Sequence, residues 1–490
     1  MISGHRGGFS TKRPGRQRLY RMLGAARTTA ARVRAVGTRI WVQGARTPSG
    51  QVEQGTVPGF GGSIGLSGLS GGTTGSGGFG VFGAPEGTFT AIGGQEAECR
   101  TAVEGVAQRS AYTGRPKDCS AGPGRKRRRQ VTEAILLVGG KGTRLRPLTV
   151  HTPKPMVRAA GVPFLTHQLA RARAAGVHHI VLATSYLAEV FEPYFGDGSS
   201  LGLHIEYVTE EEPLGTGGAI RNVATRLHSG PDDPVLIFNG DILTGLDIRA
   251  LVRTHETTGA DVSLHLTKVT DPRAYGLVPT DRTGRVLAFL EKPQTPEEIV
   301  TDQINAGAYV FRRSVIDTIP AGRPVSVERE TFPDLLSAGA HLQGMVDSTY
   351  WLDLGTPAAF VRGSADLVLG RAPSPAVPGH CGDRLVLPTA RVAPDAKLTG
   401  GTVVGEGAFV AEGARVFGST ILPGAVIEPG AVITDSLIGT RARVGERSVL
   451  TGTVIGDGAV IGADNELRDG MRVWCDVRIP AGAVRFSSDQ

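Results

Sequence analysis

Apolar and polar positions alternate in two different ways along this chain, and the first pattern occupies residues 131–371. Four short apolar runs have the length and composition of buried strands: 133–138, 179–184, 204–209 and 235–241. The stretch 163–176 instead has the spacing of a helix and ends on a glycine. This alternation predicts a Rossmann-like α/β domain, with a mostly parallel sheet covered by helices on both faces.

The second pattern begins at residue 392, where aliphatic residues recur every six positions, with three steps of five that lie 17 residues apart. The sixteen positions are Val392, Leu398, Val404, Val410, Val416, Ile421, Ile427, Ile433, Ile438, Val444, Leu450, Ile455, Ile461, Leu467, Val473 and Ile479. This period predicts a parallel β-helix with three sides, in which each aliphatic side chain points inward. The three steps of five then make the same corner of the coil one residue shorter than the other corners on successive turns.

Charge separates a leader from the rest of the chain. Residues 1–130 carry 20 Lys or Arg against 6 Asp or Glu, whereas the remaining residues carry 33 against 40. With 14 glycines between residues 51 and 90, the leader has too little apolar area to offset the entropy of ordering it. We therefore predict a disordered basic Gly-rich leader at 1–130, an α/β domain at 131–371, a linker at 372–390 and a β-helix at 391–490.

Several interpretations of the leader stay open. Its Arg- and Ala-rich start fits an organellar transit peptide, although no clear amphipathic helix accompanies it. The run 125–129, "RKRRR", fits contact with nucleic acid or an anionic surface, but also a solvated charge cluster. The leader also fits sequence upstream of the natural start, which is the interpretation that we favour. We expect no nucleic-acid partner.

The cysteines and the hydropathy of the chain limit the cellular locations that we expect for the protein. Cys99, Cys119, Cys381 and Cys475 are scattered, without the spacing of a metal site. No apolar run approaches the roughly 20 residues of a membrane helix. We therefore predict a cytoplasmic protein with reduced thiols and no membrane partner.

Glycines and cations follow the first apolar run, in "VGGKGTRLRPLTVHTPKP" at 138–155. Glycines let the backbone approach a ligand and turn successive amides toward phosphate oxygens. Arg144, Arg146 and Lys154 add positive charge, and no acidic residue lies between Glu133 and Glu189. The segment matches neither GxxxxGK[ST] nor GxGxxG, yet its charge predicts a polyphosphate site.

Two aspartates are candidate metal ligands. Asp241 follows the apolar run "VLIF", and Asp353 lies in "WLDLGTP". A carboxylate at the end of a strand suits Mg²⁺, which prefers oxygen ligands, although an aspartate there can also cap a helix.

The pattern GGxGTRLxPLTxxxPKP resembles the signature of the sugar-1-phosphate nucleotidyltransferases. Members of that family have a GT-A-like fold, join a sugar phosphate to a nucleoside triphosphate and release pyrophosphate. With "VTEEEPLGTGGAI", "FLEKP", "INAGAYVF" and the repetitive tail, the chain looks most like the mannose-1-phosphate guanylyltransferases that carry a left-handed β-helix of hexapeptide repeats. Thymidylyl- or uridylyltransferases acting on glucose 1-phosphate are the alternative within the family. A non-catalytic, sugar-nucleotide-sensing regulatory subunit is the alternative of another class.

The resemblance implies a role for each matching residue. Arg144 and Lys154 would stabilise the triphosphate and the developing charge, and Asp241 and Asp353 would together hold Mg²⁺. The implied nucleotide-binding residues are Leu137, Gly139, Gly140, Gly142, Thr143, Gly215 and Thr216. The implied sugar-phosphate-binding residues are Gly276, Glu291, Lys292 and Asn305.

Some relatives with such tails are also acetyltransferases that use a histidine. The last histidine here, His380, precedes the repeats, so we expect the tail to serve oligomerisation or regulation instead. The implied partners are therefore the two small-molecule substrates and a second copy of the chain.

Overall fold

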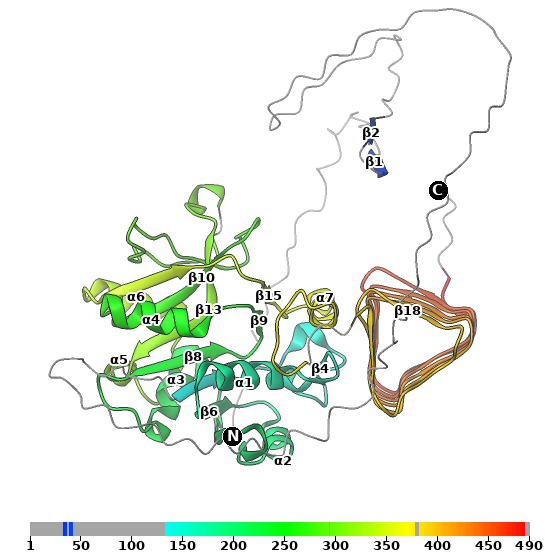
Figure 1. The fold of residues 1–490 in the computed structure, drawn as a ribbon, viewed down its shortest axis with the longest axis horizontal. Coiled ribbons are helices and arrows are strands. Elements are labelled where there is room, and N and C mark those ends of the chain that lie inside the picture. The colour runs from blue at the N-terminus through cyan, green and yellow to red at the C-terminus, as the bar shows by residue number, and fades with distance from the viewer. Residues whose placement is uncertain (1–32, 37–38, 43–132, 294, 378–381, 486–490) are drawn as a thin grey trace, which may run out of the picture. The chain divides into compact units, whose positions relative to one another are not determined.

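The computed structural model describes residues 33–36, 39–42, 133–293, 295–377 and 382–485 (Figure 1). In the leader these are two antiparallel strands, β1 (Val33–Val36) and β2 (Arg39–Val42). The rest of 1–130 lies outside the described residues, as do Cys99, Cys119 and Cys381, so the predicted leader and domain bounds stay predictions. Chain contacts define two compact units, Met1–Gly94 and Gln95–Gln490, and the α/β domain and the repetitive tail both belong to the second.

A nine-stranded sheet forms the centre of the α/β domain. Its strands are β3 (Glu133–Leu137), β6 (His179–Thr184), β7 (His204–Thr209), β8 (Pro234–Asn239), β10 (Val262–Lys268), β11 (Gly276–Leu277), β12 (Leu290–Glu291), β13 (Gln303–Arg312) and β14 (Leu342–Val346). The order is β12-β11-β13-β8-β3-β6-β7, and β10 pairs with β13 and β14. Strands β8, β3, β6 and β7 are parallel, whereas β13 runs antiparallel to its neighbours β8, β10 and β11. The four predicted strands are confirmed with small shifts at their ends.

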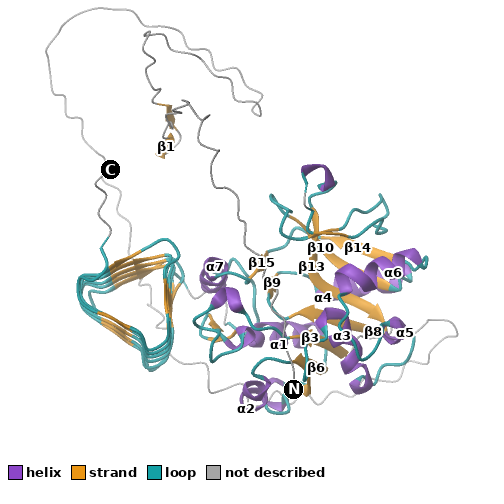
Figure 2. Ribbon diagram, turned by 180° about the vertical axis from the view of Figure 1, so that it is seen from behind, coloured by secondary structure: helices purple, strands orange, loops and turns teal. Residues whose placement is uncertain are grey.

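Helices cover both faces of this sheet, as predicted (Figure 2). They are α1 (Phe164–Ala175), α2 (Phe191–Phe195), α3 (Gly215–Val223), α4 (Ile248–Thr258), α5 (Arg313–Thr318), α6 (Phe332–Ser337) and α7 (Pro357–Val368). Because successive side chains of a strand point to opposite faces, Ile135 packs in one core with α3 and α6, and Leu136 in another with α1, α2 and α4. Helix α1 ends at Gly176, whose φ of 101° is the left-handed cap that a glycine allows.

Short elements complete the domain. They are β4 (Arg158–Ala159), β5 (Val162–Pro163), β9 (Ile242–Thr244), β15 (Trp351–Asp353), and the single turns η1 (Thr143–Leu145), η2 (Lys154–Met156), η3 (Ala188–Val190), η4 (Ser199–Leu201), η5 (Ala224–Arg226), η6 (Pro296–Glu298) and η7 (Val327–Thr331). Two of them, β9 and β15, pair antiparallel and become important at the site.

The repetitive tail forms a parallel β-helix with three sides (Figure 1). The first sheet contains β16 (Arg384–Val386), β19 (Thr402–Val404), β22 (Thr420–Ile421), β25 (Leu437–Ile438), β28 (Val454–Ile455) and β31 (Arg472–Val473). The second contains β17 (Arg391–Val392), β20 (Phe409–Val410), β23 (Val426–Ile427), β26 (Arg443–Val444), β29 (Val460–Ile461) and β32 (Arg478–Ile479). The third contains β18 (Lys397–Thr399), β21 (Arg415–Phe417), β24 (Val432–Thr434), β27 (Val449–Thr451) and β30 (Glu466–Leu467). All sixteen predicted aliphatic residues belong to its core, with Val392 and Ile479 partly buried at the ends. The predicted left hand of the coil stays a prediction.

The three short steps fall at the corner between the third and the first sheet. Gly418, Asp435 and Gly452 occupy this corner on successive turns, all with left-handed backbone (φ 54°, 47° and 63°). Next to them, the amide of Ser436 donates to Ser419 Oγ, and the amide of Thr453 donates to Ser436 Oγ, both at 3.0 Å. A stack of hydroxyl groups therefore satisfies corner amides between coils.

Replacing Ile438 by alanine should test how much this core stabilises the β-helix. Ile438 is fully buried and lies between Ile421 and Ile455 in the stack. We expect the free energy of unfolding to fall by about 3 kcal/mol, because three buried carbon groups of the side chain are lost and a cavity remains. Urea unfolding measures the change, and Val477→Ala, at a 41% exposed position, should change it by less than about 1 kcal/mol. Equal losses of unfolding free energy in the two variants would contradict the inward orientation of the Ile438 side chain.

The outer face of the first β-helix sheet packs against the α/β domain. Val403, Leu437 and Val454 share an apolar cluster with Leu145 and Phe360. Near this contact, Arg472 Nη1 donates to the carbonyl of Arg146 at 3.1 Å. The β-helix therefore supports the segment that follows the glycine loop.

Candidate active site

The glycine-rich segment forms an exposed turn at the carboxyl end of β3. The Gly240 amide donates to the Leu137 carbonyl at 2.9 Å, and a Cβ on Gly240 would lie only 2.5 Å from that oxygen. The ends of β3 and β8 can therefore approach only with a glycine there. Beyond Leu137, Gly139 and Gly140 are exposed, and Gly142 has a left-handed backbone with φ of 55°. The predicted glycine turn is thus present, and it is exposed.

One neighbour of this turn was not predicted from the sequence. Ser185, just after β6, accepts a hydrogen bond from the Gly140 amide at 3.3 Å. A Cβ on Gly139 would lie 2.9 Å from the same hydroxyl oxygen. Ser185 therefore limits the position of the loop, and its only sequence signal is its place after a strand that neighbours β3.

The two candidate metal ligands lie next to each other. Strands β9 and β15 pair with Ile242 opposite Asp353, and the Leu354 amide donates to the Asp241 carbonyl at 3.0 Å. Lys154 reaches both carboxylates from η2. Its Nζ is 2.8 Å from Asp241 Oδ2 and 3.9 Å from Asp353 Oδ1. The structure therefore brings Lys154, Asp241 and Asp353 together, as the resemblance implies.

The charge balance of this group favours a cation. Burial raises the pKa of Asp353, and the nearby Asp241 raises it further, while Lys154 and Arg144 oppose the shift. Within the described residues, the buried Oδ1 atoms of Asp353 and Asn239 have no hydrogen-bond partner. Oxygen atoms of this kind are the ligands that Mg²⁺ prefers, so the donor set fits that ion.

Arg144 lies on the same side as the carboxylates, exposed on η1 beside the exposed Thr143. A Cβ on Gly355 would lie 2.5 Å from Arg144 Nη2, so the glycine of "WLDLGTP" leaves room for the guanidinium. Arg146 has a different setting, because its carbonyl accepts the hydrogen bond from Arg472 of the β-helix. Of the three predicted cations, Arg144 and Lys154 are near the carboxylates, whereas the main chain of Arg146 contacts the tail.

The predicted sugar side is formed by β11 and β12. Gly276 pairs with Glu291, and a Cβ on Gly276 would lie 2.7 Å from Glu291 Oε2. Adjacent strand residues normally point to opposite faces, but Lys292 has φ of 52° and leaves the strand geometry. Its Nζ consequently lies 3.5 Å from Glu291 Oε1. The side chains of Glu291 and Lys292 are thus together, as a shared role requires.

The side chain of Asn305 makes two hydrogen bonds to residues close to it in the sequence. Its Nδ2 donates to Tyr309 Oη at 2.7 Å, and its Oδ1 accepts from the Gly307 amide at 3.1 Å. Close by, the Trp351 indole donates to the Ala306 carbonyl at 3.0 Å, and the Tyr275 ring packs edge-on against Trp351 at 5.5 Å. Tyr275 therefore packs against Trp351, which connects the sugar side to the strand of Asp353.

Two of the predicted nucleotide-binding residues, Gly215 and Thr216, begin helix α3. Gly215 is exposed, with φ of 69°, and a Cβ there would lie 2.7 Å from the Val325 carbonyl oxygen. Thr216 Oγ1 donates to Glu328 Oε2 at 3.0 Å and accepts from the Val327 amide at 2.9 Å. The Thr216 side chain thus holds the η7 turn, a contact that no sequence pattern indicates. Nucleotide binding by Gly215 and Thr216 stays a prediction.

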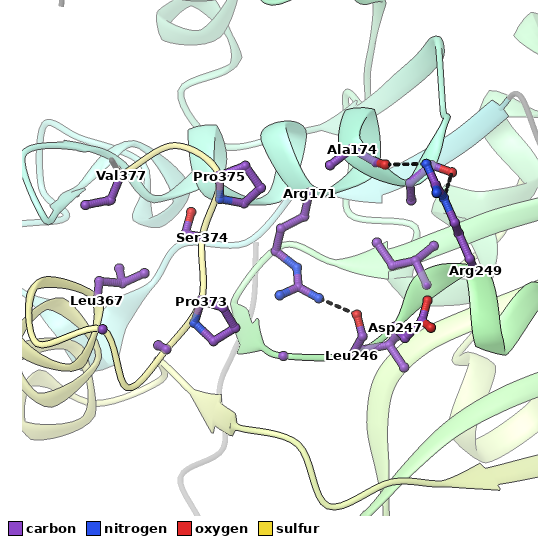
Figure 3. Close-up of a pocket in the computed structure, with 15 residues that line it drawn as sticks. Arg171, Ala174, Leu246, Asp247, Arg249, Leu367, Pro373, Ser374, Pro375 and Val377 are labelled. Atoms are coloured by element: carbon purple, nitrogen blue, oxygen red, sulfur yellow. Dashed lines mark hydrogen bonds between the residues drawn. The ribbon is translucent and has the colours of Figure 1, made fainter. Parts of the chain in front are cut away.

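A cavity of about 690 Å³ lies between α1, the start of α4 and the segment after α7 (Figure 3). Its arginines are already engaged, since Arg171 donates to the Leu246 carbonyl at 2.7 Å and Arg249 to the Ala174 carbonyl at 2.8 Å. None of the predicted site residues belongs to its lining. The candidate active site is therefore the group at the carboxyl ends of the strands, where ligands gather in open α/β sheets.

In the part of the chain that the structure describes, every helix is too short or too polar to cross a membrane.

Comparison with known proteins shows which proteins this chain resembles. The nucleotidyl transferase family matches residues 133–368, and the GMPPB C-terminal domain matches residues 380–487. The mannose-1-phosphate guanylyltransferase of Mycobacterium tuberculosis (strain ATCC 25618 / H37Rv) is 58% identical over 358 residues, which are 73% of this chain and 98% of that protein. The catalytic subunit beta of the Drosophila melanogaster enzyme is 38% identical over 267 residues, 53% of this chain and 71% of that protein. Mannose-1-phosphate guanylyltransferase 1 of Arabidopsis thaliana is 36% identical over 271 residues, 55% of this chain and 68% of that protein.

Proposed function

The chain belongs to the mannose-1-phosphate guanylyltransferases, and on that premise we propose that it transfers GMP from GTP to mannose 1-phosphate, giving GDP-mannose and pyrophosphate. The observation that carries the proposal is the meeting of Asp241, Asp353 and Lys154 beside the glycine turn. This arrangement supports a site for two phosphorylated reactants, because it combines an exposed glycine turn, a buried ammonium and a pair of carboxylates.

The reaction is a direct displacement. An oxygen of the sugar phosphate attacks the α-phosphorus of the triphosphate, in line with the departing pyrophosphate, so no residue of the protein becomes covalently modified. Catalysis then depends on position and charge.

Each group of residues has one task in this reaction. The glycine turn of Gly139, Gly140 and Gly142 binds the triphosphate, and Arg144 and Lys154 neutralise charge that develops on it. Glu291 and Lys292 orient the sugar phosphate. Asp241 and Asp353 would hold Mg²⁺, which supplies further charge neutralisation at the phosphates when it is bound.

Pyrophosphate release tests the proposal. The full chain would be assayed with mannose 1-phosphate, Mg²⁺ and each of GTP, ATP, UTP and dTTP, and we expect turnover with GTP. Turnover with only dTTP or UTP would show that the base assignment is wrong. Absence of turnover with all four would favour the non-catalytic, sensing alternative.

Deletion of residues 1–130 should leave kcat/KM unchanged. Both family matches begin after this segment, and every residue proposed to contact a substrate lies at or beyond Leu137. Initial rates for the full and shortened chains measure the effect, with thermal midpoints as a control for folding. A large loss of rate at an unchanged midpoint would mean that the leader takes part in the reaction.

We also propose that the β-helix mediates self-association in the cytoplasm. Phe417 and Trp474, two large apolar side chains, are 50% and 52% exposed on it. The molar mass in solution of the full chain tests this, and a strictly monomeric protein would contradict it.

A further inference from the structure

Three histidines and two glutamates gather near the amino ends of three neighbouring strands. The glycine turn lies at the opposite, carboxyl ends of the strands. They are Glu133 on β3, His179 on β6, His204 and Glu206 on β7, and His228 after η5. Strands β6 and β7 pair in parallel with His179 opposite His204 and Val181 opposite Glu206. Because side chains two positions apart share a face, His204 and Glu206 lie on the face of His179.

Glu133 fixes the orientation of the His179 ring. It is only 3% exposed, and its Oε1 lies 2.8 Å from His179 Nδ1. The amides of His228 and Ser229 each donate to the same carboxylate at 2.8 Å. Both oxygens of this carboxylate therefore accept hydrogen bonds, and Nδ1 of His179 faces Glu133.

This arrangement turns His179 Nε2 toward two further donor atoms. Nε2 lies 3.0 Å from Glu206 Oε1, and the His179 ring stacks on His204 at 5.0 Å. The donor atoms of His179, His204 and Glu206 all lie within 4.8 Å of one another. A ligating histidine in proteins typically donates its other ring N–H to a carboxylate, as His179 does to Glu133.

The remaining neighbours leave this donor set accessible. The exposed side chain of Arg226 contacts the other oxygen of Glu206, with Nη1 3.4 Å from Oε2. His228 stacks on the opposite side of His179 at 4.8 Å. His204 is exposed, whereas His179 is buried. An ion can therefore approach from solvent without displacing a packed side chain.

We propose that His179, His204 and Glu206 form a binding site for a divalent transition metal ion of the Zn²⁺ class, with Glu133 orienting His179. Two imidazole nitrogens with one carboxylate oxygen suit Zn²⁺ and similar ions, whereas Mg²⁺ prefers oxygen ligands alone. The ion replaces the proton that His179 Nε2 and Glu206 otherwise share. The site is separate from Asp241 and Asp353 and does not depend on the proposed function.

Equilibrium dialysis of the metal-free full chain against Zn²⁺ tests this proposal. The wild type should bind one more equivalent of Zn²⁺ than the double variant His204→Ala/Glu206→Gln. Zn²⁺ that binds at the catalytic carboxylates or at cysteines is counted equally in both proteins, so the difference isolates this site. His178→Ala removes an exposed histidine just before β6 and should bind as the wild type does.

Two further readouts exclude trivial explanations. Zn²⁺ should raise the thermal midpoint of the wild type more than that of the double variant, since an ion that binds only the folded state stabilises it. The double variant should keep its midpoint without metal and its guanylyltransferase rate, because its changes are far from the reacting groups. Equal Zn²⁺ stoichiometry in the wild type and a folded double variant would overturn the proposal, and the cluster would then hold only a proton.

Discussion

Replacing Asp241 by asparagine is expected to lower kcat about 10³-fold, or ~4 kcal/mol in the activation free energy. The substitution removes one of two adjacent carboxylates, so the oxygen donors for the divalent ion lose half of their charge. It also weakens the 2.8 Å contact that fixes Lys154. Steady-state pyrophosphate release at saturating Mg²⁺ measures the loss.

The matching control is Asp302→Asn, which removes an exposed carboxylate that pairs with Lys268 on β10. This variant should keep the wild-type rate. Both variants should retain the wild-type thermal midpoint within a few degrees. A lower rate then reflects loss of a catalytic group and not unfolding. A near-normal rate for Asp241→Asn would remove this residue from the metal site.

Replacing Lys154 by methionine is expected to lower kcat about 10²-fold, because the buried ammonium is aimed at the place where charge develops. Lys154 is 9% exposed, and methionine preserves much of its length and apolar packing. The change should affect kcat more than KM, since a charge that develops in the transition state is weaker in the ground state.

Lys141→Met provides the control, because Lys141 lies in the same glycine turn but is exposed. It removes an equal charge from the same loop and should cost less than about threefold in kcat. Similar losses for the two lysines would mean that the net charge of the loop, and not the position of Lys154, supports turnover.

Local periodicity explains why much of the fold could be predicted. The β-helix core follows from the steps of six and five, because each inward position depends only on its neighbours along a coil. Strands β6 and β7 match their apolar runs residue for residue. No apolar run predicted β12, which contains only Leu290 and Glu291.

Contacts between distant segments explain what could not be predicted. Asp241 and Asp353 meet through the pairing of β9 with β15, so their adjacency came from the family resemblance and not from spacing. Arg146 falls on a variable position of the motif, and the hydrogen bond that its carbonyl accepts from Arg472 in the tail could not be predicted from spacing. The hydrogen bond between Thr216 and Glu328 likewise joins segments that no local pattern connects.

The most direct test of the central claim is a crystal structure of the full chain with GTP and Mg²⁺. We expect the Arg144 guanidinium and the Lys154 ammonium within about 3 Å of phosphate oxygens, with the ion between Asp241 and Asp353. A structure in which both cations face away from the triphosphate would contradict the account.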